Sequence, residues 1–287
     1  MQVADRLRNS RLLRRPLLAA SRTLFSLLRG GPPLLRRAAY DAMPVPYLVA
    51  GHPEHFVVST ADKVIGREVF LHGEFDFAKL QTALAILGRE GRPAPTHLID
   101  VGANIGTITI PALKRGLIQT ATAIEPHPHN LRLLRANIAL NGLEDRVTVL
   151  AQAVGDRSGV TLHLHESATN SGNHSIGAEG IPVSSSKLDD LDLPSAPSLL
   201  WMDIEGYEGH ALTGAGRLLS TGTPAVCEFN PTYLEHSGGL ELLKKATLGY
   251  EIFDLKSPNS TSTSLDKVNN KYRTINEFTD ILLIKPR

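Results

Sequence analysis

Short hydrophobic runs alternate along this chain with longer segments in which apolar residues recur every three or four positions. The runs are typical of strands buried on both faces, and they fall at 96–101, 121–125, 146–151, 198–203 and 225–229. The spacing between them predicts helices near 77–87, 105–115, 130–141, 207–220 and 240–248. Strands that alternate with helices predict an α/β protein with a doubly wound, mostly parallel sheet.

The remaining segments follow other patterns. Short apolar or alternating runs predict strands at 56–60 and 68–71, a hairpin formed by 160–165 and 181–183, and two closing antiparallel strands at 250–255 and 280–284. Residues 256–273 are polar and rich in Ser, Thr and Asn. This composition predicts a long mobile loop.

The first 45 residues differ from the rest of the chain because basic residues crowd there. Arginine recurs throughout this segment, and Asp5 is the only acid before Asp41. A short helix is expected to begin at Pro16, and Gly30 to Pro33 would end it. No apolar run here has the roughly 20 residues that a membrane span needs. We therefore expect a basic helical extension at 1–45 and one α/β domain at 46–287.

Three roles for this extension compete. It packs on the domain or on a second subunit of a homo-oligomer, it lies on an anionic membrane surface, or it is an organellar transit peptide. The sequence does not decide between them. The location that we expect is cytoplasmic, either free or peripheral to a membrane.

Composition excludes several classes of protein. The formal net charge is +1 over 287 residues, and the basic residues cluster outside the α/β domain, so nucleic acid is not an expected partner. The single cysteine, Cys227, lies in an apolar run and fits a reducing compartment. No Cys/His spacing resembles a zinc site. The apolar fraction of 42% is enough for a sizeable core.

The loop after the strand at 96–101 carries the first chemical signal. It reads Asp100-x-Gly102-x-x-x-Gly106, and Asn104 and Thr107 replace the second and third glycines of a dinucleotide fingerprint. A carboxylate at the strand end suits an ammonium group and would repel a pyrophosphate. The N–H groups at the start of the next helix suit a single carboxylate. The loop therefore favours a ligand with an amino-acid end.

The ends of the next two strands supply the rest of a cofactor site. Glu125, followed by Pro126, can accept hydrogen bonds from the two hydroxyls of a ribose. Gln152 and the backbone of Ala153 are the expected contacts of an adenine. An amino acid, a ribose and an adenine together describe S-adenosylmethionine. Methyl transfer is therefore favoured over hydride transfer.

A second group of acids follows the later strands. A hydroxyl acceptor benefits from a general base, for which Asp203 is the first choice and Glu205, Glu228 and His174 are the reserves. Asp203 could instead hold the methionine ammonium or cap the next helix. Asp203 and Glu228 also suit magnesium, but without further ligands we expect no bound metal.

Several motifs in order resemble the FkbM-type S-adenosylmethionine-dependent methyltransferases. They are Asp100 to Gly106, Glu125-Pro126, Ala153-Val154-Gly155-Asp156 with Gly159, Leu188-Asp189-Asp190-Leu191, and Asp203 to Glu208. The resemblance covers roughly residues 70 to 255. It implies a class I methyltransferase fold and transfer of methyl to a hydroxyl of a sugar, glycolipid or secondary metabolite.

One residue departs from the family pattern. The family usually has a lysine two residues before the Asp of its Asp-x-Glu-Gly motif, and Trp201 stands there in this chain. This departure motivates a non-catalytic cofactor-binding or scaffold protein as an alternative. A nicotinamide-dependent oxidoreductase is the less favoured alternative, because the glycines that it needs are missing.

Overall fold

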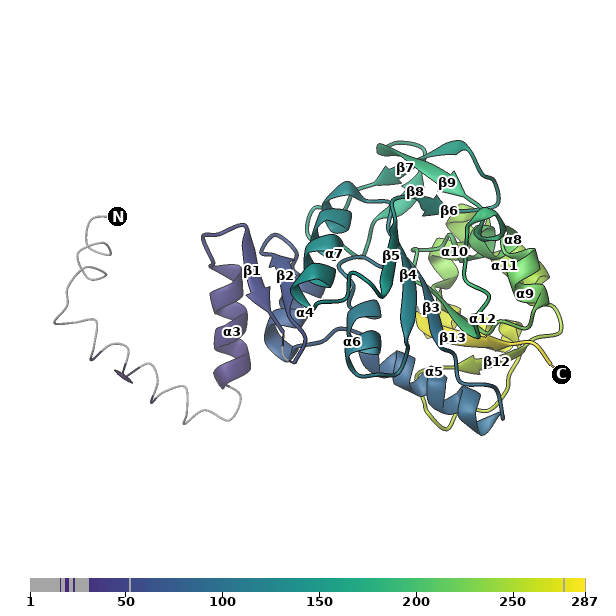
Figure 1. The fold of residues 1–287 in the computed structure, drawn as a ribbon, viewed down its shortest axis with the longest axis horizontal. Helices are drawn as coiled ribbons and strands as arrows, with labels where there is room; N and C mark the ends of the chain where they lie inside the picture. Colours follow the sequence, from purple (N-terminus) through teal and green to yellow (C-terminus); the bar gives the residue numbers. More distant parts are fainter. Residues whose placement is uncertain are drawn as a thin grey trace.

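A seven-stranded sheet forms the centre of the computed structural model, which describes residues 16, 19, 20, 23, 31–51, 53–275 and 277–286 (Figure 1). Its strands lie in the order β12 (Glu251–Asp254), β13 (Thr279–Ile284), β11 (Ala225–Phe229), β10 (Ser198–Met202), β3 (His97–Val101), β4 (Thr120–Ile124) and β5 (Val147–Leu150). Six of these strands run in one direction, and β13 runs in the opposite direction between β12 and β11. The doubly wound, mostly parallel sheet predicted from the sequence is confirmed.

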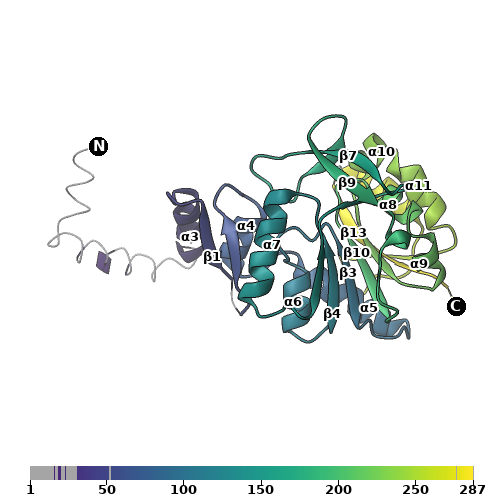
Figure 2. The same cartoon turned by 45° about the horizontal axis from the view of Figure 1, so that its top comes forward.

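Helices cover both faces of the sheet (Figures 1 and 2). One face packs against α5 (Phe77–Arg89), α6 (Thr109–Lys114) and α7 (Pro128–Leu140). The other packs against α8 (Glu208–Thr213), α9 (Gly216–Ser220), α10 (Pro231–Ser237), α11 (Gly239–Ala246) and α12 (Leu265–Ile275). Burial on both sides explains why the strands read as continuous apolar runs.

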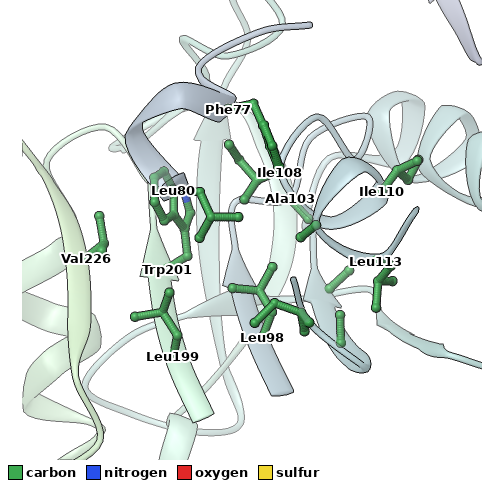
Figure 3. Packing of buried hydrophobic residues seen from close by; sticks show 14 of the residues in the cluster. Phe77, Leu80, Leu98, Ala103, Ile108, Ile110, Leu113, Leu199, Trp201 and Val226 are labelled. Atoms are coloured by element: carbon green, nitrogen blue, oxygen red, sulfur yellow. The ribbon is translucent and has the colours of Figure 1, made fainter. Parts of the chain in front are cut away.

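The strand pleat divides the core into two layers. Leu98, Leu199 and Trp201 point to the α5 side, where Figure 3 shows them beneath Phe77 and Leu80. The alternate residues of the same strands, such as Leu200, point to the α8 side. Side chains alternate along each strand, so β10 and β11 are packed on both faces. These two strands hold Asp203, directly after β10, and Glu228, near the end of β11.

Two smaller sheets flank the central one. A four-stranded sheet contains β6 (Ala153–Val154), β9 (Ile181–Ser186), β7 (Val160–His165) and β8 (Ser175–Gly177), in that order, and the 3-10 helix η1 (Leu188–Asp190) follows it. An N-terminal unit contains α3 (Gly31–Asp41), the hairpin β1 (Tyr47–Ala50) and β2 (Phe56–Ser59), and α4 (Ile65–His72). Figure 1 shows α3 and β1 at one end of the molecule, beyond α7.

Two segments were predicted wrongly. Residues 68–71, expected as a strand, belong to helix α4, because Asp62 accepts the backbone N–H groups of Val64 and Gly66 at the start of that helix. Residues 256–273, expected as a mobile loop, include most of α12. This helix buries Leu265, Val268, Asn269 and Tyr272 at helical spacing.

Three of the expected helices differ clearly from their predicted bounds. The 105–115 segment begins its helix late, at Thr109, and the 207–220 segment is divided into α8 and α9 at Gly214. Helix α7 begins at Pro128 with His127 as its cap, where Asn130 was expected. A further helix, α3, starts at Gly31, inside the stretch that was expected to end the helix from Pro16. The helix expected from Pro16 lies almost entirely outside the described residues.

None of the helices in the described ranges is long and apolar enough to cross a membrane.

Candidate active site

Two glycines of the loop after β3 lie close to neighbouring parts of the chain, one against backbone and the other against a side chain. Gly102 has a φ of +84°, and a Cβ at this position would lie 2.1 Å from the carbonyl oxygen of Asp203. Gly106 has a φ of +93°, and a Cβ there would lie 2.7 Å from Ile110 Cδ1. Only glycine suits such positions. The loop therefore fits against the end of β10, which carries the second group of acids.

Asp100 lies inside β3 at the C-terminal edge of the sheet. Its Oδ2 accepts a hydrogen bond of 2.5 Å from Thr109 Oγ1, and the side chain is 1% exposed. Burial raises the pKa of Asp100 to about 6, against the opposing effect of the Thr109 hydrogen bond. This carboxylate is poised to gain from a positive ligand, since an ammonium would offset the cost of its burial.

Glu125 connects the end of β4 to the glycine loop. Its Oε2 accepts the backbone N–H of Asn104 at 2.8 Å, and its Oε1 accepts the backbone N–H of His127 at 2.7 Å. Burial raises the pKa of Glu125 to about 7, and the two N–H donors act in the opposite direction. Each carboxylate oxygen keeps a second lone pair, so Glu125 can still accept a hydrogen bond from a ligand.

These residues line one pocket at the C-terminal ends of β3, β4 and β10. Its polar lining includes Asp100, Asn104, Glu125, Gln152 and Asp203. Apolar side chains complete the wall, among them Ile65, Phe75, Leu164, Ile176 and Trp201. A mostly apolar pocket with a few polar groups is typical of a small-molecule site. A crevice outside the carboxyl ends of the strands is where doubly wound sheets bind their ligands.

The segment 169–174 closes one side of this pocket. The Ser171 carbonyl accepts hydrogen bonds from Asn104 Nδ2 at 2.7 Å and from Asn130 Nδ2 at 3.1 Å. The Ser171 hydroxyl donates to Asp62 Oδ2 at 2.5 Å. Asp62 also caps α4, so the N-terminal unit holds this segment over the glycine loop. The sequence interpretation missed Asp62 and Ser171, because neither belongs to a motif.

His174 lies in the pocket wall beside a second histidine. Its ring is 4.2 Å from the ring of His127, centroid to centroid, and its Nδ1 accepts the backbone N–H of Ser167 at 3.0 Å. Burial, followed by the charge of His127, lowers the pKa of His174 to about 4. The ring is therefore neutral at neutral pH.

Asp203, Glu205 and Glu228 come together just beyond the pocket. One carboxylate oxygen of each lies within 4.8 Å of the others. Burial raises the pKa of Asp203 well above its usual range, and the charge of Glu205 adds to the effect. Burial also raises the pKa of Glu228, and there the charge of Asp203 adds to the effect. Burial and Glu208 raise the pKa of Glu205 to about 8. Like charges at this spacing cannot all ionise without a positive neighbour.

Two further acids and one lysine surround this cluster. The sequence interpretation gave none of them a role in the site, although Glu208 ends the last of the family motifs. Glu208 is fully buried, and its Oε1 accepts the backbone N–H of Ile204 at 3.0 Å. Asp280 of β13 pairs in register with Glu228. Lys79 of α5 reaches both Asp280, at 2.7 Å, and Asp76, at 2.8 Å. Lys79 could not be found from sequence, because the turn of α5 that carries it contains no motif.

Trp201 occupies the position at which the family pattern has a lysine. Its side chain is 3% exposed and packs in the core against α5 (Figure 3). It also lines the pocket. Lys79, which projects from α5 on the same side of the sheet, is the cation whose charge acts on Asp203. The positive charge near the acids thus comes from a different element.

The structure brings most of the predicted site residues together. The cofactor-site residues Asp100, Gly102, Asn104, Glu125, Pro126, Gln152, Ala153 and Asp203 line the pocket, as does His174. Gly106 shapes the loop behind it. Glu205 and Glu228 do not line the pocket, but they lie against Asp203.

Solved structures of similar fold include several methyltransferases. The M. jannaschii TYW2 structure in complex with S-adenosylmethionine is 14% identical, covers 84% of this chain and 87% of its own, and has a TM-score of 0.43. Precorrin-6y C5,15-methyltransferase from Geobacter metallireducens is 16% identical over 72% of this chain and 87% of its own, with a TM-score of 0.40. These likenesses are too distant to indicate a substrate.

A comparison with curated proteins found no match. The model of the methyltransferase FkbM domain matches residues 100–254, from the acid of the glycine loop to the end of β12. This range is more than half of the chain, and it contains Asp100, Glu125, Asp203 and Glu228. The chain therefore belongs to the FkbM methyltransferase family and is an S-adenosylmethionine-dependent methyltransferase.

Proposed function

We propose that this protein is an O-methyltransferase that acts on a hydroxyl of a sugar, glycolipid or secondary metabolite. The observation that carries the proposal is the position of Asp203, which lines the cofactor pocket and also belongs to the acidic cluster beyond it. A group in this position can face both the donor methyl and an acceptor oxygen. A hydroxyl is a poor nucleophile, so a carboxylate at this point has a clear use.

The pocket residues fit the parts of S-adenosylmethionine. Glu125 retains free lone pairs for the ribose hydroxyls, and Gln152 with Ala153 forms the part of the wall assigned to the adenine. Asn130 Oδ1 is buried without a hydrogen-bond partner in this wall, which leaves an acceptor for a ligand donor. Asp100 and the glycine loop are assigned to the amino-acid end.

The reaction forms a bond between the acceptor oxygen and the methyl carbon and breaks the carbon–sulfur bond, whose electron pair stays on sulfur. The acceptor's hydroxyl proton must then leave. Asp203 accepts it in our proposal, with Glu205 and Glu228 able to share the charge because their oxygens lie within 4.8 Å. His174 is neutral at neutral pH and is the remaining candidate base. Alignment of acceptor and methyl supplies much of the rate.

The cofactor also prepares the base. Without ligand, burial and the neighbouring Glu205 raise the pKa of Asp203 well above its usual range. The sulfonium and ammonium of the bound cofactor are both positive, and a nearby positive charge lowers a carboxyl pKa. Cofactor binding should therefore lower the pKa of Asp203 and favour the carboxylate form that can accept a proton.

The test is a screen of the purified protein with methyl-labelled S-adenosylmethionine against glycan, lipid and small-metabolite fractions. Label in a methyl ether supports the proposal, and label on nitrogen or in a methyl ester contradicts it. Asp203→Asn should bind S-adenosylhomocysteine and lose turnover if Asp203 is the base. Cofactor binding with no methylation of any fraction would favour the scaffold alternative.

A further inference from the structure

The acidic cluster contains more negative charge than the reaction requires. Asp203, Glu205 and Glu228 each place an oxygen within 4.8 Å of the other two, and Glu208 and Asp280 lie close enough to raise the pKa of Glu228 as well. A single general base would do for removing one proton. The remaining carboxylates need another explanation.

The three clustered carboxylates have no direct protein partner in the described part of the chain, and only the charge of Lys79 acts on Asp203 from a distance. Within the described ranges, the side chains of Asp203, Glu205 and Glu228 form no hydrogen bond or ion pair, with each other or with any neighbour. The nearby Lys79 ammonium contacts Asp280 and Asp76 instead. Buried or half-buried carboxylates without a partner are costly, and such groups are usually paired or coordinate a metal.

Glu228 is a second, separate indication of a ligand. Its side chain is 8% exposed, and its Oε2 is buried with no hydrogen-bond partner. Its carboxylate nevertheless points toward Asp203 and Glu205 rather than toward a donor. A buried acceptor that turns toward two other acceptors is costly, and a cation between them would offset that cost.

We propose that Asp203, Glu205 and Glu228 bind one divalent cation of the Mg²⁺ or Mn²⁺ type. Hard carboxylate oxygens are the ligands that these ions prefer. Around an octahedral Mg²⁺, adjacent ligands lie about 3.0 Å apart and opposite ligands about 4.2 Å apart, so three oxygens that lie within 4.8 Å of one another would draw closer together around the ion. Three protein ligands leave further positions for water and for an oxygen of the acceptor.

The assignment differs from the expectation of no metal because the sequence offered only two of the three ligands. Glu205 has a φ of +52°, a left-handed conformation that is uncommon for a residue other than glycine. No spacing rule predicts where a side chain points from such a turn. The role of the ion in holding the acceptor hydroxyl rests on the proposed O-methyltransferase function; the binding of the ion does not.

The test measures Mn²⁺ binding to the full chain by electron paramagnetic resonance and by calorimetry, with and without S-adenosylhomocysteine. Wild-type protein should bind one Mn²⁺, and Glu228→Gln and Glu205→Gln should each lower the affinity at least about tenfold. Both variants should still bind S-adenosylhomocysteine, which shows that they fold. Glu241→Gln changes a glutamate whose side chain is 72% exposed, and it should bind Mn²⁺ like the wild type.

Three results would overturn the site. The first is that the wild type takes up no Mn²⁺ at millimolar concentration, and the second is that Glu228→Gln takes up as much as the wild type. The third is that Mn²⁺ and S-adenosylhomocysteine exclude each other, which would assign the cluster to the cofactor's ammonium. The proposed function fails separately. If Mn²⁺ binds but no hydroxyl is methylated, the cation site stands and the acceptor class is wrong. If a hydroxyl is methylated at full rate in EDTA and no Mn²⁺ binds, the acceptor class stands and the cation site is wrong.

Discussion

Replacing Glu125 with Gln should weaken cofactor binding and flatten the dependence of stability on pH. The carboxylate is 4% exposed and accepts two backbone N–H groups, and burial raises its pKa to about 7. Gln keeps the size of the side chain but does not titrate. It also offers one acceptor oxygen in place of two.

The effect on stability follows from the two pKa values of Glu125. The folded protein holds the proton more tightly than the unfolded chain, in which the pKa is 4.5. The stability contributed by this group is therefore complete below about pH 4.5 and is lost as the pH rises through about 7. The difference corresponds to about 3 kcal/mol. As the pH rises from 4.5 to 8, the free energy of unfolding of the wild type should therefore fall by up to that amount relative to that of Glu125→Gln.

At pH 8 the same substitution should weaken cofactor binding, although it raises the relative stability. Hydrogen bonds to a charged group contribute roughly 1.5–3 kcal/mol each, and the variant keeps one neutral acceptor for the ribose. The expected loss is about 10-fold to 100-fold in Kd. A destabilised variant would lose both stability and affinity. Loss of affinity together with a gain of relative stability at high pH therefore identifies a ribose contact.

The assay combines calorimetric titration of S-adenosylhomocysteine with urea unfolding at several pH values. The exposed Glu179→Gln serves as the control and should match the wild type in both measurements. A 3′-deoxy analogue should bind the wild type more weakly than S-adenosylhomocysteine does, and should make little difference to Glu125→Gln. Equal affinity of the variant and the wild type at pH 8 would refute the assignment of Glu125 to the ribose.

Three further perturbations test other parts of the structure. Gly102→Ala places a Cβ against the Asp203 carbonyl, so it should abolish S-adenosylhomocysteine binding in a calorimetric titration; retained affinity would contradict the close approach. Lys79→Met leaves Asp280 buried and unpaired, so the free energy of unfolding in urea should fall by about 3–5 kcal/mol. The double variant that also carries Asp280→Asn should regain most of that stability. Trp201 is the only tryptophan and lines the pocket, so its fluorescence should change on cofactor binding; an unchanged spectrum at saturation would show that the cofactor binds elsewhere.

The buried strands could be predicted from sequence because their environment is uniform. A parallel strand covered on both faces contains little besides apolar residues, and the glycine loop that follows β3 marks its end. The same reasoning placed Asp100 and Glu125 at one edge of the sheet, where the pocket is found. These predictions needed only local sequence and the rule that parallel strands align their carboxyl ends.

The helices that were missed owe their position to contacts across the fold. α12 is mostly polar, and its four buried residues are separated by charged and amide side chains. Its apolar face was therefore hidden within a sequence that is typical of a loop. α4 was taken for a strand because its β-branched and aromatic residues favour strands, and the capping role of Asp62 decides otherwise.

The acidic cluster marks the limit of sequence interpretation for the site. Asp203 and Glu228 end adjacent strands and could be placed together. Lys79 and Asp280 reach the same place from α5 and from β13, which lie far apart along the chain. No signal within a single sequence connects residues that lie so far apart along the chain.

The antiparallel strand β13 has a consequence for how the protein is made. It lies between β11 and β12, so these strands stay unjoined until residues 279–284 have left the ribosome. Until then β11 presents an open edge to other nascent chains, and such edges invite aggregation. The half of the molecule that contains the glycine loop can fold earlier during synthesis. We therefore expect that chains ending before residue 279 accumulate as insoluble species or depend on chaperones.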